Sequence, residues 1–169
     1  LEQFQTNKMS EDICRNKELY CTQFNNQKLY GIRAVVMMNQ PTIAEEAFFK
    51  NYMVKFVFAP NTQTLKTKAF SDCYFLQRFH SNSLQVIEEN AFAYCSALSM
   101  IDLRKVTKIG RESLHQCVSL VFVNLSSLQH PIAANYFEGC SSLKQVVAKG
   151  SLEKLDVNPD ESDECEYVQ

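Results

Sequence analysis

Four cysteines recur at nearly constant intervals along the chain. They stand at positions 73, 95, 117 and 140, so the intervals between them are 22, 22 and 23 residues. A fixed period of about 20–50 residues is typical of stacked repeats, in which each unit packs only against its neighbours. The sequence therefore predicts a solenoid.

Apolar positions recur with the same period. Each unit has an aromatic residue or leucine three residues before the cysteine position and an aliphatic residue three after it. One period before Cys73 stands Asn51, so five units align, and a weaker one precedes them at Ile32 and Val35. We expect the residues three before the cysteine position to form a buried column, because one short unit cannot bury its own apolar face. These residues are Phe48, Phe70, Phe92, Leu114 and Phe137.

The unit that runs from Leu98 to Cys117 reads LSMIDLRKVTKIGRESLHQC. This pattern resembles the BspA-like leucine-rich repeats, and the resemblance covers about residues 32–150. It implies an α/β solenoid, a right-handed superhelix with short parallel strands on the concave face and short helices, 3-10 turns or strands on the convex side. The residues themselves support a strand, since Ile101 and Leu103 alternate at the strand period and would point inward together.

The period divides the chain into three regions. Residues 1–31 form an N-terminal capping segment, 32–155 a solenoid of about five to six repeats of 22–23 residues, and 156–169 an acidic tail. Ile13, Lys17, Tyr20 and Phe24 recur at helical spacing, which predicts a capping helix over the first coil. The tail has six acidic and no basic side chains, so we expect it to be disordered.

Composition and spacing exclude several classes of function. The net charge of −2 and the pI near 5.9 argue against a nucleic-acid partner, and no apolar run approaches the ~18 residues of a membrane span. Four glycines cannot build a phosphate-binding loop, and the cysteines lack the close pairs of zinc sites. The three histidines occupy different repeat positions, so no catalytic constellation is expected. We therefore expect no enzyme, no cofactor and no metal.

Two interpretations of the cysteine column differ in chemistry. The first is a redox or metal column. The second is a set of small buried residues with weak S–H donors, and Asn51 at the same position favours it. His115 lies two residues before Cys117, which predicts a local hydrogen bond between them.

We expect the functional residues on the surface, because the interior residues pack the repeats against one another. Side chains five and seven residues after the cysteine position should point out across the concave face. Aromatic residues, methionine and arginine, which are enriched at interface centres, occur among them. The candidate protein-binding residues are Phe56, Phe58, Arg78, His80, Met100, Asp102, Phe122 and Asn124.

The predicted function is a non-catalytic protein-interaction module with a protein partner, self-association included. The family resemblance implies adhesion or surface recognition and a place at the cell surface or outside the cell. The alternative is an intracellular scaffold that uses the same face. Free thiols at all seven cysteines would favour the cytoplasm, whereas a Cys14–Cys21 disulfide would favour export.

Overall fold

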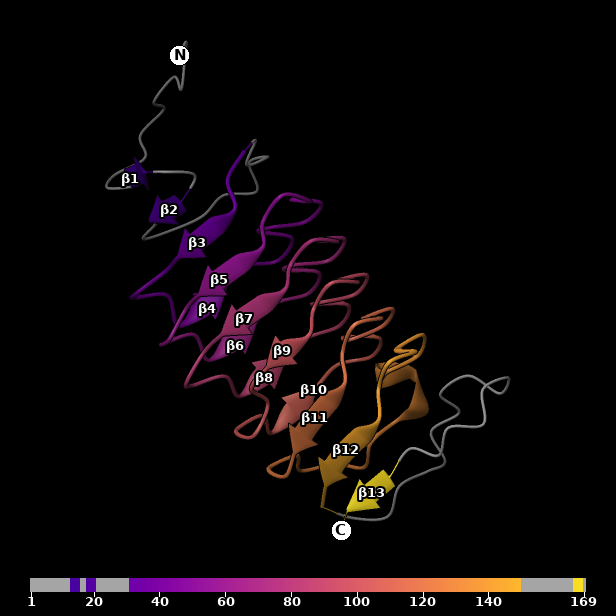
Figure 1. Cartoon of the computed structure of the whole chain (residues 1–169). Helices are drawn as coiled ribbons and strands as arrows, with labels where there is room; N and C mark the ends of the chain where they lie inside the picture. The colour runs from indigo at the N-terminus through magenta and orange to yellow at the C-terminus, as the bar shows by residue number, and fades with distance from the viewer. Residues whose placement is uncertain (1–12, 16–17, 21–30, 150–165, 169) are drawn as a thin grey trace.

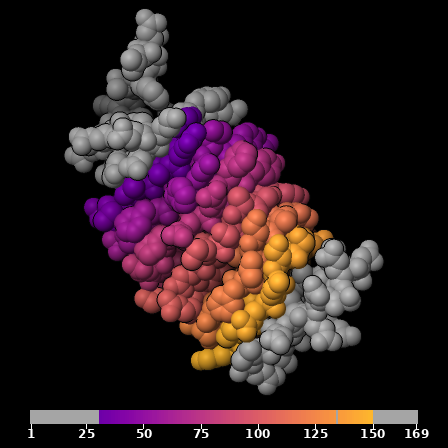
Figure 2. All heavy atoms as spheres, viewed as in Figure 1, coloured from indigo at the N-terminus to yellow at the C-terminus, as the bar shows by residue number. Residues whose placement is uncertain are grey.

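The computed structural model describes residues 13–15, 18–20, 31–149 and 166–168 of the chain. Nearly all the elements are short strands, which form three sheets. Figure 1 shows the strands side by side along one stack, and Figure 2 shows the successive coils as bands in contact with their neighbours. The fold is a parallel-strand β-solenoid of about five turns.

The largest sheet has the strand order β1-β2-β3-β5-β7-β9. Its members are β1 (Ile13–Arg15), β2 (Glu18–Tyr20), β3 (Ala34–Val36), β5 (Phe56–Phe58), β7 (Arg78–His80) and β9 (Met100–Ile101). From β2 onward the neighbours are parallel, and Phe56 pairs with Ala34 on one side and Arg78 on the other. Equivalent positions of consecutive repeats therefore lie directly beside each other.

Two smaller parallel sheets complete the stack. Opposite the first sheet lie β4 (Thr42–Ile43), β6 (Thr64–Leu65), β8 (Val86–Ile87) and β10 (Lys108–Ile109). At the C-terminal end, β11 (Phe122–Leu125), β12 (Gln145–Ala148) and β13 (Glu166–Val168) form the third sheet. The sole helix among the described residues is the 3-10 helix η1 (Ala134–Tyr136).

The repeated positions build the core as expected. Phe48 stacks on Phe70 with ring centroids 4.8 Å apart, and Phe70 stacks on Phe92 at 5.5 Å. The complete column of aromatic residues and leucine has no exposed surface: Phe48, Phe70, Phe92, Leu114 and Phe137. The inward strand residues are also buried, at 2% exposure or less for Val35, Val57, Phe79, Val123 and Val146. The predicted register is therefore confirmed.

Turns and strands, rather than helices, occupy the side opposite the first sheet. In four repeats two residues four apart have positive φ, as at Asn90 (55°) and Tyr94 (61°). A left-handed residue interrupts a right-handed helix. It also aims its N–H at the next coil, where Asn90 donates to Arg111 O (3.0 Å) and Tyr94 to His115 O (2.8 Å). Of the alternatives expected for this side, strands and the 3-10 helix η1 occur, whereas the described residues contain no α-helix there, because bonds between coils replace bonds within a helix.

The predicted capping helix is also wrong wherever the structure describes its residues. Ile13–Arg15 and Glu18–Tyr20 are antiparallel strands, and Leu19 of β2 pairs with Val35 of β3. A strand satisfies the backbone groups at the edge of a sheet, which a helix cannot do. Lys17, Phe24 and Cys21 lie outside the described residues.

Part of the predicted disordered tail is a strand. Glu166–Val168 form β13, which pairs in parallel with β12 through Gln145 and Glu166. The expectation of disorder is wrong there, because the open edge of β12 offers backbone partners at nearly the repeat spacing. Residues 156–165 and 169 lie outside the described part of the chain. The domain boundaries stay a prediction.

Candidate functional site

The outward side chains of β3, β5, β7, β9 and β11 form one surface, together with Asp102, which follows β9. We call it the ladder face. Four of its apolar side chains are strongly exposed: Phe56 (46%), Phe58 (42%), Met100 (55%) and Phe122 (46%). Their neighbours in the chain point into the core, because successive residues of a strand face opposite sides. Exposed apolar side chains gathered on one surface are typical of interaction sites.

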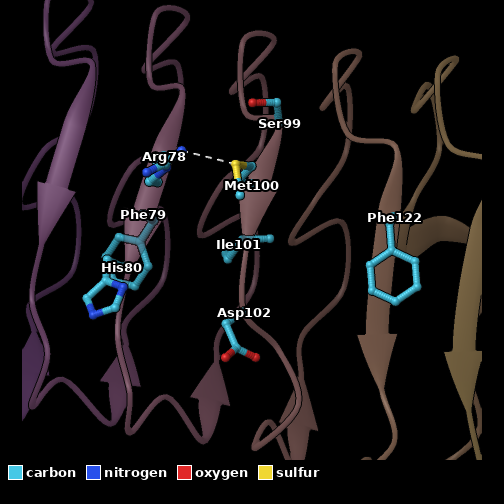
Figure 3. Close-up of a pocket in the computed structure, with 8 residues that line it drawn as sticks. All are labelled: Arg78, Phe79, His80, Ser99, Met100, Ile101, Asp102 and Phe122. Carbon is cyan, nitrogen blue, oxygen red and sulfur yellow. Dashed lines mark hydrogen bonds between the residues drawn. The ribbon is translucent and has the colours of Figure 1, made fainter.

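Contacts between coils order several of these side chains. The Phe58 and His80 rings stack with centroids 4.9 Å apart and planes within 4°. The Arg78 guanidinium donates from Nη2 to Met100 Sδ at 3.1 Å (Figure 3). Adjacent strands thus place an aromatic pair beside a cation–thioether pair. The structure places the candidate residues of β5, β7 and β9 on three adjacent strands.

Asp102 and Asn124 occupy equivalent positions and have a local role as well. The Asp102 carboxylate accepts from Arg104 N at 3.1 Å, and Asn124 Oδ1 accepts from Ser126 N at 3.0 Å. Each side chain therefore holds the turn after its strand. The Arg104 side chain also donates to Asp102, and these bonds lower the pKa of the Asp102 carboxyl below its usual value. Both residues border the ladder face while they stabilise its edge.

The ladder is interrupted between β9 and β11. These strands belong to different sheets, although Tyr94 and His115 join the same two coils on the other side. At the interruption lies a pocket of about 390 Å³, shown in Figure 3. Ile101 is only partly buried there, unlike the residues at the same repeat position, Val57, Phe79, Val123 and Val146. The pocket is lined by Arg78, Phe79, His80, Ser99, Met100, Ile101, Asp102 and Phe122.

The four cysteines of the repeats, Cys73, Cys95, Cys117 and Cys140, are free and buried in the turns. Each thiol donates to a carbonyl oxygen of the preceding coil, at distances of 3.0–3.3 Å in the four cases. Burial raises the pKa of Cys73 and of Cys140 to about 12, and it raises the pKa of Cys95 and of Cys117 well above the usual value. These thiols are packing groups with weak S–H donors, as the second interpretation predicted.

The histidines lie apart, as their repeat positions indicated. His80 belongs to the ladder face, and Ile109 N donates to His130 Nε2 at 3.4 Å. The predicted bond between His115 and Cys117 is wrong, because the thiol turns to Phe92 O. The His115 Nδ1 atom lies 3.8 Å from a Glu138 carboxylate oxygen instead. Within the described ranges no cluster of three potential metal ligands occurs.

Sequence analysis overlooked a second exposed group beside the cysteine column. Tyr52 stacks on Tyr74 with centroids 5.4 Å apart, and the Tyr74 hydroxyl donates to Asp72 at 2.9 Å, which raises the pKa of Tyr74. The signal was present in the residues adjacent to the cysteine position, which include aromatic residues in three units. This turn-edge patch consists of Tyr52, Met53, Tyr74, Phe75 and Tyr94.

Solved structures of known proteins share the fold. A leucine-rich repeat protein of T. pallidum matches with a TM-score of 0.64 and 23% identity, over 86% of this chain and 71% of that one. A leucine-rich cell surface protein of Faecalibacterium prausnitzii matches with a TM-score of 0.60 and 20% identity, over 85% and 44%. The pneumococcal vaccine antigen PcpA matches with a TM-score of 0.62 and 20% identity, over 78% and 35%. The chain thus spans less than half the length of the last two.

No curated protein sequence matches the chain. In the part of the chain that the structure describes, no helix has the length and apolar character needed to cross a membrane. The model of the BspA type leucine rich repeat region matches residues 17–158 in six copies. This chain belongs to the BspA-type leucine-rich repeat family.

Proposed function

We propose that the chain is a non-catalytic module that binds a protein partner through the ladder face. The observation that carries this proposal is the group of exposed apolar side chains, Phe56, Met100 and Phe122, gathered on the face that also holds the pocket. The family to which the chain belongs commonly mediates protein–protein interaction. Aromatic residues, methionine and arginine at the centre of such a surface are the usual energetic anchors of an interface.

The pocket at the ladder interruption supports the same face. It lies between Arg78, Met100 and Phe122, so a partner side chain that enters it would contact both sheets. Well-packed pockets near the centre of an interface contribute most of the binding free energy. The candidate residues Phe58, His80, Asp102 and Asn124 would surround this centre.

The finer function that we propose is adhesion or surface recognition. This proposal is supported by structural similarity, since one of the similar proteins is a cell surface protein and another is a vaccine antigen. The second candidate is an intracellular scaffold, and it is favoured by the four free thiols, which use no disulfide to staple the coils. Mapping the oxidation state of Cys14 and Cys21 in protein isolated from its source separates the two, because a bridge would favour export.

The test is selection of random displayed peptides on the wild-type protein, followed by measurement of their affinity for the double variant Phe56→Ser/Phe122→Ser. We expect the selected peptides to lose about thirtyfold or more in affinity, the effect of truncating interface aromatics at ~2 kcal/mol. The melting temperature should change little, since exposed substitutions usually stay within ~0.5 kcal/mol.

The matched control is Tyr52→Ser/Tyr74→Ser, which removes two exposed aromatic rings from the turn-edge patch. It should leave the affinity of the same peptides unchanged. Equal binding to the wild type and the ladder-face variant would reject the proposed function. Loss of binding in the control alone would move the site to the turn-edge patch.

A further inference from the structure

Charge is divided unevenly between the two halves of each coil. The strand half comprises residues 33–39, 55–61, 77–83, 99–105, 121–127 and 144–149, and it carries seven basic residues against one acidic residue, Asp102. The intervening segments, from residue 40 to residue 143, carry five basic and seven acidic residues. The strand half includes the ladder face, so this face is positive while the side opposite is negative.

The basic side chains flank the apolar centre of the ladder face. Arg33, Lys55 and Lys144 directly precede β3, β5 and β12, and Arg78 begins β7. Arg104, Lys105 and Lys149 follow the strands at the other edge. Apolar residues between two charged edges form the usual anatomy of a protein interface, in which a dry centre is surrounded by a polar rim.

Several of these cations have no acidic partner among the described residues. Asp102, the acidic residue of the strand half, is bound by Arg104 at 2.7 Å. Arg78 contacts the sulfur of Met100, and no carboxylate of the described residues lies within ion-pair distance of Arg33, Lys55, Arg78 or Lys144. On the opposite half, Lys66 pairs with Glu88 at 2.6 Å and Arg111 with Glu112 at 2.9 Å, while no carboxylate of the described residues lies within ion-pair distance of Lys50, Lys68 or Lys108.

We infer that the ladder face takes an acidic polypeptide, whose apolar side chains cover Phe56, Met100 and Phe122 while its carboxylates reach the basic edges. This inference rests on the proposed function and specifies the chemistry of the partner. Complementary charge at an interface rim speeds association and rejects partners of the wrong sign. The cations that pair with no carboxylate in the described ranges are the groups that such a ligand would neutralise.

Two other anionic occupants fit the face less well. A nucleic acid would need free aromatic faces for its bases, but His80 covers one face of the Phe58 ring. The Asp102 carboxylate also stands beside the centre, where it would repel phosphates. A second copy of the chain would have to offer its negative half, where Lys66 and Arg111 already neutralise two of the carboxylates.

The experiment measures fluorescence anisotropy with three labelled synthetic peptides. They share the same leucine and phenylalanine positions and carry glutamate, glutamine or lysine at all the others. We expect the glutamate peptide to bind at least about tenfold more tightly than the glutamine peptide, and the lysine peptide not to bind. The preference should shrink as salt rises from about 50 mM to about 300 mM, because exposed charges are screened.

Two double variants with the same change in charge locate the effect. Lys55→Gln/Arg78→Gln removes two cations from the strand half, and we expect about a tenfold loss of affinity for the glutamate peptide. Lys68→Gln/Lys108→Gln removes two from the opposite half, and we expect less than about a twofold change. Equal losses of affinity in the two variants would overturn the inference, since the net charge of the protein, and not the position of its cations, would then determine binding.

The remaining outcomes separate this inference from the proposed function. If displayed peptides selected on the protein depend on Phe56 and Phe122 but are not acidic, the proposed function stands and the inference fails. If no peptide depends on those rings, both fail. Tighter binding of a single-stranded oligonucleotide than of the glutamate peptide also overturns the inference, as does self-association that Lys55→Gln/Arg78→Gln abolishes.

Discussion

The two sides of the coils differ in how they are joined. We call the side of the coils that holds the cysteine turns, opposite the ladder face, the turn side. There, backbone hydrogen bonds join each coil to the next, such as Phe70 N to Ala91 O (2.8 Å) and Phe92 N to Ser113 O (2.9 Å). On the ladder side the pairing stops at β9 and resumes at β11. The stack therefore depends on one side for continuity and can leave the other side open. This difference explains how a pocket occurs on a repeat whose core is so regular.

We expect the largest loss of stability from a substitution in the buried aromatic column on the turn side. Phe92 has no exposed surface and contacts Phe70 and Phe79, so Phe92→Ala should lower the free energy of unfolding by about 3–5 kcal/mol. Ile101 borders the pocket on the ladder side and is only partly buried, so Ile101→Ala should cost less than half as much. Urea denaturation gives both values.

Hydrogen exchange extends this test to the neighbouring coils. Because repeats are stabilised by their neighbours, Phe92→Ala should raise exchange in the coils on both sides. Equal losses for Phe92→Ala and Ile101→Ala would contradict the difference between the two sides. Opening confined to the mutated coil would contradict a continuous core.

The next effect concerns the close approach of two coils at Gly110. A Cβ atom at this position would stand 2.5 Å from Glu89 N, a backbone atom that cannot simply rotate away. Gly110→Ala should therefore cost about 1–3 kcal/mol in unfolding free energy, measured by thermal or urea denaturation. The comparison variant is Gly31→Ala, where nothing lies within 4 Å and only the positive φ of 77° opposes the substitution. If Gly110→Ala were neutral, the turn side would be more compliant than its bonds indicate.

The smallest effect is the contribution of each thiol to pH dependence. The pKa of the Cys95 thiol is raised by burial, so above about pH 9 the unfolded chain releases this proton while the folded protein retains it. Its stabilising contribution is full below that pH and is lost as the pH rises. We expect a decline on the order of 1 kcal/mol per pH unit per thiol, measured by urea denaturation at several alkaline pH values.

Cys95→Ala is the control. It should reduce the fall of the unfolding free energy with pH by the contribution of one thiol. Alkylation mapped by mass spectrometry at neutral pH should leave the four repeat cysteines unmodified until the protein unfolds, because the thiolate is the reactive form. Rapid modification of Cys95 in the native protein would show that the turn side opens more readily than the ladder side.

The repeat and its register could be predicted from the sequence because burial imposes a period on the residues. Phe48, Phe70 and Phe92 recur at one position since each must cover its neighbour, and such regularity is visible without a structure. Ser81 is the informative exception. It stands eight residues after the cysteine position, where the other units have alanine or leucine, and it is buried all the same because its hydroxyl donates to Thr62 O at 2.7 Å. A satisfied hydroxyl tolerates burial that an unpaired one would not.

The turns and the ladder interruption could not be predicted in this way. Positive φ falls on Lys50, Tyr94 and Gln116, residue types that carry no turn signal of their own. The interruption at β9 depends on how two whole coils meet, which no residue pattern records. For the candidate site, sequence alone indicated which side chains point outward, whereas the pocket and the Phe58–His80 stack required the coordinates of neighbouring coils.

The bonds that the left-handed turn residues donate have a consequence for how such a protein can evolve. Main-chain N–H groups at positions such as Asn90, Tyr94 and Gln116 hold one coil to the next, whatever side chain each carries. A substitution there changes the chemistry displayed to the surroundings without removing an attachment between coils. Selection can therefore rewrite the exposed residues of one repeat at a time, and a gene of this kind can diversify its surface while it conserves its fold.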